Sequence, residues 1–151
     1  MDSTPLRTAF ALLLSAGLLG CEPTLQPYSR AEYRKTPEDL RLQAMPLHPY
    51  PASLPEVSPS YVGGQYGLSV NRLELLQDSG EDWKDLQVWV NETYVAPLGD
   101  MPDGKLVQVP FRVMYDAQGK EMPWFRTDVV PEKVEIVREG QRVQVPVRQA
   151  D

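Results

Sequence analysis

The chain has 151 residues, a net charge of −6 and a single cysteine, and these features exclude several classes of protein. An acidic chain lacks the clustered lysines and arginines that displace counterions from nucleic acid, so we exclude nucleic-acid binding. With no second cysteine the chain forms no intramolecular disulfide and no thiolate metal site, so core packing must hold its folded part together.

The first segment, residues 1–20, has the pattern of an export signal. A weakly positive start that contains Arg7 is followed by eleven uncharged residues from Ala9 to Leu19, AFALLLSAGLL. Eleven residues are too few to cross a bilayer as a helix, which takes about 20. They suit the apolar region of a secretory signal peptide.

This segment leads into Leu18-Leu19-Gly20-Cys21, which resembles the lipobox of bacterial lipoproteins: an aliphatic residue three positions before the cysteine and a small residue directly before it. The resemblance implies cleavage after Gly20 and attachment of a diacylglyceryl group to the Cys21 sulfur. Two long acyl chains make such an anchor effectively permanent. A chance cysteine in an ordinary signal peptide, or at the buried start of a helix, is the alternative.

The resemblance also predicts a location. A lipid-anchored chain of this kind belongs to the bacterial cell envelope, where it faces the periplasm or the exterior. Glu22 follows the cysteine in place of the Asp that is associated with retention in the inner membrane. This residue weakly favours the outer membrane.

Residues 21–60 are expected to form a lipidated, proline-rich tether. Eight of the fifteen prolines lie between Glu22 and Ser60, and prolines at this density interrupt both helices and sheet ladders. One short helix is predicted from Pro37 to Ala44, because Thr36 can cap it and Pro37 suits its first position. His48, the only histidine, is interpreted as a solvated residue of the spacer, which argues against a catalytic triad or a multi-histidine metal site.

Residues 61–151 are expected to form a β domain. Runs of alternating polar and apolar residues, rich in β-branched and aromatic side chains, predict half-buried strands. The stretch YVGGQYG, at 61–67, is interpreted as a flexible lead-in to this domain. The expected strands are 67–76, 84–91, 93–97, 105–115, 120–126, 133–138 and 142–148.

Short strands at regular spacing, without helices between them, predict a small antiparallel β-sandwich or barrel. The stretch LELLQDSGEDWKDLQVWVN followed by PLGDMPDGKLVQVPF resembles the immunoglobulin-like and fibronectin type III-like modules of bacterial envelope proteins. The resemblance covers roughly residues 67–115 and implies a sandwich fold. It implies no function by itself.

Few residues are arranged for chemistry. Asp78, Glu81, Asp82 and Asp85 form an acidic cluster that could hold Ca²⁺ or serve glycoside hydrolysis, but the EF-hand spacing is missing and a hairpin turn offers no cleft. A solvated acidic turn is the simpler interpretation. We expect no enzyme activity, no metal and no cofactor.

The aromatic residues are the remaining candidates for a binding surface. Trp89 alternates with Val88 and Val90, so either the valines or the tryptophan faces the core. An exposed Trp89 could form a stacking platform with Tyr94 and Trp124 for a sugar or a protein partner. The alternative is that these rings fill the second face of a sheet or pack beneath loops.

These observations lead to two functional hypotheses. The first is a membrane-anchored envelope lipoprotein with a non-enzymatic β-sandwich that binds or supports protein partners. The second is a module that binds carbohydrate or cell wall through Trp89, Tyr94 and Trp124.

Overall fold

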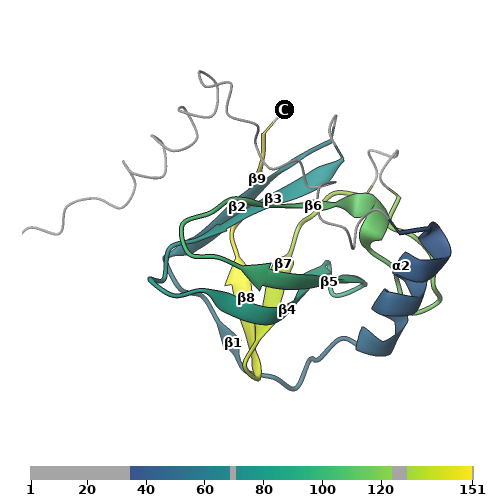
Figure 1. Cartoon of the computed structure of the whole chain (residues 1–151), viewed down its shortest axis with the longest axis horizontal. Coiled ribbons are helices and arrows are strands. Elements are labelled where there is room, and N and C mark those ends of the chain that lie inside the picture. Colours follow the sequence, from purple (N-terminus) through teal and green to yellow (C-terminus); the bar gives the residue numbers. More distant parts are fainter. Residues whose placement is uncertain (1–34, 69–70, 124–128, 151) are drawn as a thin grey trace, which may run out of the picture.

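The structure, a computed structural model, describes residues 35–68, 71–123 and 129–150 (Figure 1). Strands in two sheets and one short α-helix make up most of this part of the chain, so the expected all-β class is confirmed. Gly20, Cys21 and Trp124, for which we predicted roles, lie outside the described residues.

The first sheet has five strands in the order β1-β8-β7-β4-β5. Its strands β4 and β7 fall on the expected runs 84–91 and 133–138, while β5 begins within the expected run 93–97 and continues to Met101. Hairpin turns join β4 to β5 and β7 to β8, and Asn91, Glu92, Glu139 and Gly140 adopt positive φ there, as primed turns require. The strand bounds are β1 Glu56–Val57, β4 Trp83–Val90, β5 Tyr94–Met101, β7 Val134–Arg138 and β8 Gln141–Val145.

The second sheet has four strands in the order β6-β3-β2-β9. It contains β2 Val62–Gly67, β3 Arg72–Gln77, β6 Val107–Pro110 and β9 Val147–Gln149. The pairs β1–β8 and β2–β9 are parallel, while the other pairs of described strands are antiparallel. The sheets are therefore mixed, which corrects the expectation of a purely antiparallel arrangement.

Prolines divide two of the expected strands. The run 142–148 becomes β8 in the first sheet and β9 in the second, because Pro146 has no N–H with which to continue the ladder. The run 105–115 ends as a strand at Pro110 and continues as the 3-10 turn η4, Phe111–Val113. Tyr115 then bridges to Val95 of the first sheet. At both prolines the chain passes from one sheet to the other.

The stretch YVGGQYG is a strand and not a flexible lead-in, which corrects our interpretation. Its residues 62–67 form β2, which pairs with β3 on one side and with β9 on the other. Gly64 is required there, because a Cβ atom at this position would lie 2.6 Å from the backbone oxygen of Glu74. The glycines therefore serve the close approach of neighbouring strands.

The segment before Tyr61 packs against the sheets, in contrast to the expected spacer. The predicted helix is present as α2, Pro37–Ala44, with Thr36 as its N-cap, and it is followed by the 3-10 turn η3, Met45–Leu47. Leu40 and Ala44 join the same buried cluster as both sheets, and α2 lies beside β5 and η4 (Figure 1). The prolines interrupt regular structure here without keeping the segment apart from the core.

Candidate binding site

Trp89 lies in β4, an inner strand of the five-stranded sheet between β7 and β5, and both faces of this strand are covered around Trp89. Val88 and Val90 are fully buried, and so is Trp89, with an exposed fraction of 0%. A stacking platform needs an exposed ring face, so Trp89 cannot be part of the platform that we considered for it with Tyr94 and Trp124. Tyr94 is half-buried, and burial raises the pKa of its hydroxyl.

The segment after α2 provides the cover over Trp89. The rings of His48 and Tyr50 meet the indole edge to face, with centroids 5.2 Å and 5.4 Å away. His48 Nε2 also lies 3.0 Å from the backbone oxygen of Tyr115. His48 is thus a half-buried packing residue, which corrects its interpretation as a solvated residue of a spacer.

A polar cluster lies beside these rings and fastens the same segment to β7 and β8. Glu135, with an exposed fraction of 1%, accepts hydrogen bonds from the Tyr50 hydroxyl at 2.6 Å and from Arg142 at 2.9 Å. Arg142 also donates to the backbone oxygen of Leu54 and pairs with Glu56 of β1. Hydrogen bonds between a guanidinium and a carboxylate are shorter and stronger than bonds between neutral groups, so Arg142 ties this segment to β7 and β8.

Lys133 extends this cluster toward the β4–β5 turn. Its ammonium nitrogen lies 2.7 Å from a Glu92 oxygen and 3.5 Å from oxygens of Glu56 and Glu135. The hydrogen bond with Lys133 lowers the pKa of Glu92, and the same bond raises the pKa of Lys133. Burial, followed by the bond to Glu135, raises the pKa of Tyr50.

The charged and polar side chains of this cluster form hydrogen bonds and ion pairs with one another. The cluster therefore suits a structural role, in which it holds the segment after α2 against β7 and β8. Tyr50 and Arg142 converge on the buried carboxylate of Glu135, and Arg142 also donates to Glu56 of β1. Sequence reasoning missed the cluster because its members lie up to 92 residues apart, as Tyr50 and Arg142 do. Only the alternation in β7, which places Glu135 between apolar residues, gives a local hint of a buried carboxylate.

The acidic turn between β3 and β4 is stabilised by hydrogen bonds from side chains in and beside the turn. Gln77, which is fully buried, donates to the backbone oxygens of Glu81 and Met101 and accepts from Ser79. Asp82 accepts from the backbone N–H of Asp103. Among the described residues, no group of His, Cys, Asp and Glu side chains is arranged to hold a metal ion.

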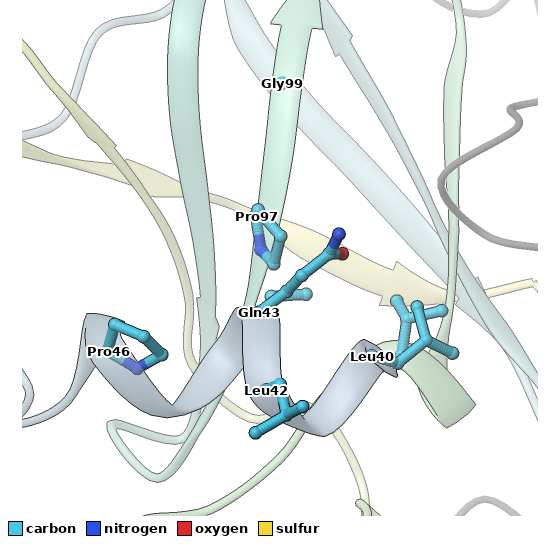
Figure 2. A pocket seen from close by; sticks show the side chains of 8 residues that line it. Leu40, Leu42, Gln43, Pro46, Pro97 and Gly99 are labelled. Atoms are coloured by element: carbon cyan, nitrogen blue, oxygen red, sulfur yellow. The ribbon is translucent and has the colours of Figure 1, made fainter. Parts of the chain in front are cut away.

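The remaining candidate is a groove of about 410 Å³ between α2 and β5 (Figure 2). β5 is an edge strand, and its outer edge is bridged at Val95, where each backbone bond with Tyr115 measures 3.1 Å. The residues of β5 that line the groove follow Val95 along the strand. Its lining is mostly apolar: Leu40, Leu42, Gln43, Pro46, Ala96, Pro97, Gly99 and Val113.

The shape of the groove follows from which residues line its two sides. Leu40 and Pro46 stand at opposite ends of the α2–η3 wall, and Gln43 reaches from α2 toward Pro97 on β5 (Figure 2). Pro97 has no N–H, so at this position the edge strand offers no hydrogen-bond donor to a further strand. Leu42 is 56% exposed, a large fraction for a leucine beside a groove.

Sequence reasoning did not find this groove. The stripe predicted for α2 contained Leu40 and Ala44, which are buried as expected. Leu42 falls outside that stripe, and an apolar residue on the outer side of a short helix is the only local signal. The opposing wall, β5, comes from residues about 55 positions later.

Comparison with known proteins adds no assignment. No family model, no curated protein and no solved structure shows a significant match to this chain. Within the described residues, no helix has both the length and the apolar character needed to span a membrane.

Proposed function

We propose that the chain is a lipid-anchored protein of a bacterial cell envelope, whose β-rich module binds a protein partner without catalysing a reaction. The ending Leu18-Leu19-Gly20-Cys21 supports the anchor, with cleavage after Gly20 and the lipid on Cys21. Permanent attachment through two acyl chains suits a protein that acts at a membrane.

The α2–β5 groove is the observation on which the binding role rests. It combines an apolar lining, an exposed leucine and an edge strand on one side of the module. Grooves with these features receive apolar side chains of a partner segment. By contrast, the polar groups around Glu135 are engaged with one another, so they support a structural role and not a reaction.

We further propose that the two sheets form a β-sandwich related to immunoglobulin or fibronectin type III modules. Buried residues of both sheets belong to one hydrophobic cluster, which supports two sheets facing each other. The parallel pairs β1–β8 and β2–β9 set this arrangement apart from a purely antiparallel sandwich.

The carbohydrate hypothesis has lost support. Its stacking platform depended on Trp89, which is covered by His48 and Tyr50. A sugar-binding surface would require this cover to move away. We therefore retain protein binding as the proposal.

Labelling with palmitate tests the anchor. Wild-type cells are expected to incorporate the label into this chain and to retain it in the membrane fraction, while Cys21→Ala abolishes incorporation. Thr93→Ala, a substitution at an exposed residue of the β4–β5 turn, is the matched control and is expected to retain the label. A wild-type chain without label would overturn the proposed lipidation.

A further inference from the structure

We propose that the α2–β5 groove docks an apolar segment of another membrane-attached protein, close to the bilayer. This inference rests on the proposed lipid anchor. It joins two observations: the groove is apolar, and one of its walls is α2, the first helix of the described residues. A partner seated there therefore lies near the attachment point.

The packing of residues 36–57 limits how far the module can stand from the membrane. A tether that ended at residue 60 would contain 39 residues after Cys21 and could reach about 120 Å in the polyproline form. The described contacts begin at Thr36 and continue through Glu56. Thirteen residues, 22–34, lie between Cys21 and the described chain, and a segment of thirteen residues reaches no more than about 40 Å in the polyproline form.

The start of α2 is held firmly to the module, so this limit applies directly to the groove. The Tyr115 hydroxyl donates to the backbone oxygen of Pro37 at 3.0 Å. Leu40, three residues later, is 4% exposed and lines the groove. The groove is thus the first surface of the described module that follows the anchor along the chain.

The charges beside the groove indicate an apolar protein segment as its occupant. Arg41, between two groove residues, pairs with Glu38, and Asp100, next to Gly99, pairs with Lys84 at 3.2 Å. These cations are neutralised within the module. An anionic lipid surface is bound through clusters of basic side chains, so it fits this rim poorly.

Photo-crosslinking in living cells tests the proposal with the full-length chain. Leu42→benzoylphenylalanine places the reactive group at the groove. Leu106→benzoylphenylalanine is the matched control, since Leu106 is 43% exposed and does not line the groove. We expect an adduct at position 42, and none at 106, with a protein that is itself lipidated or membrane-spanning, as identified by mass spectrometry.

The anchor should determine the yield of this adduct. Two proteins attached to one membrane meet at a raised effective concentration, so Cys21→Ala is expected to lower the yield at least about tenfold. A second variant keeps the anchor and inserts about thirty Gly and Ser residues before Lys35. Because effective concentration falls as roughly the −3/2 power of length, the expected decrease is about sixfold.

The outcomes separate this inference from the proposed function. An adduct with lipid, with a second copy of this chain or with a soluble protein overturns the inference, and so does the lack of any adduct at position 42. An unchanged yield in the spacer variant also overturns it. Failure to incorporate palmitate overturns the lipid anchor itself, whatever position 42 captures.

Discussion

At the scale of single residues, the best-defined environment in this protein is that of Trp89. Its side chain is fully buried, and the rings of His48 and Tyr50 meet it edge to face. The indole N–H has a partner as well, since it donates to Gln87 at 3.2 Å. A large aromatic side chain buried with its polar atom satisfied contributes strongly to stability.

Trp89→Ala is therefore expected to lower the free energy of unfolding by about 3–5 kcal/mol. The cavity left behind cannot collapse easily, because its walls belong to a central strand and to the rings of two other residues. Urea denaturation of the mature chain carrying Cys21→Ala, followed by circular dichroism, measures the change. Leu106→Ala, at an exposed leucine, should cost less than about 1 kcal/mol, and an equal loss in both variants would contradict this packing.

Glu92 gives a pH dependence whose sign follows from its bond to Lys133. This bond lowers the pKa of Glu92 from 4.5, so its stabilising effect is present above pH 4.5 and is lost as the pH falls through the folded-state pKa. The pKa of Lys133 is raised, so its contribution is complete at neutral pH and is lost only at strongly alkaline pH.

We accordingly expect the urea midpoint to fall on acidification below about pH 4.5, and to fall less steeply in Glu92→Gln. The measurement compares midpoints of both chains from pH 7 to pH 3. Glu132→Gln, at an exposed residue whose side chain makes no ion pair among the described residues, serves as the control and should keep the wild-type slope. Identical slopes for Glu92→Gln and the wild type would argue against this ion pair.

At the scale of elements, prolines and one glycine determine how the strands are shared between the sheets. Pro110 and Pro146 end β6 and β8, and in both cases the following residues pair with the other sheet. Gly64 allows β2 to lie between β3 and β9 without a side chain that would collide with the Glu74 backbone. The prolines end strands because they lack a backbone N–H, and the glycine permits close strand packing because it lacks a Cβ atom.

Gly64→Ala is expected to destabilise the chain by about 1–3 kcal/mol, because the added methyl group would meet a backbone oxygen that cannot rotate away. Urea denaturation measures this loss. Gln118→Ala is a suitable comparison, since Gln118 is exposed and its described hydrogen bond uses only its backbone. A Gly64→Ala chain as stable as the Gln118→Ala chain would show that β2 and β3 lie further apart.

At the scale of the whole molecule, the segment 36–57 is part of the folded unit. It supplies α2, the cover of Trp89, and Tyr50 and Glu56 of the polar cluster. The boundary that the sequence indicated at Tyr61 therefore passes through the middle of a packed structure.

A fragment of residues 61–151 is expected to lack a cooperative unfolding transition, whereas a fragment of residues 35–151 shows one. The shorter fragment lacks the rings that cover Trp89 and the Tyr50 hydroxyl that donates to Glu135. Removing a hydrogen-bond partner of a buried polar group is destabilising, and so is uncovering a buried indole. Circular dichroism against urea concentration distinguishes the two. Equal midpoints would mean that residues 35–60 add nothing to the fold.

The sequence by itself determined the features that depend on near neighbours along the chain. Alternation of apolar residues predicted β4, β5 and β7, and the Thr36-Pro37 pair predicted α2 with its correct bounds. The signal Leu18-Leu19-Gly20-Cys21 is equally local and lies outside the described residues, so the proposed anchor still rests on it alone. Such features need only the conformational preferences of a few consecutive residues.

Only the tertiary structure decided which residues are buried and where the groove lies, because the segments that pack against one another are far apart in the sequence. Alternation in β4 could not tell whether Val88 or Trp89 faces the core, since His48 and Tyr50 bury the second face. The prolines before Tyr61 predicted interruption of regular structure correctly, but burial of Leu40 depends on β5 and η4. The groove exists only where these elements meet, so no stretch of sequence contains it.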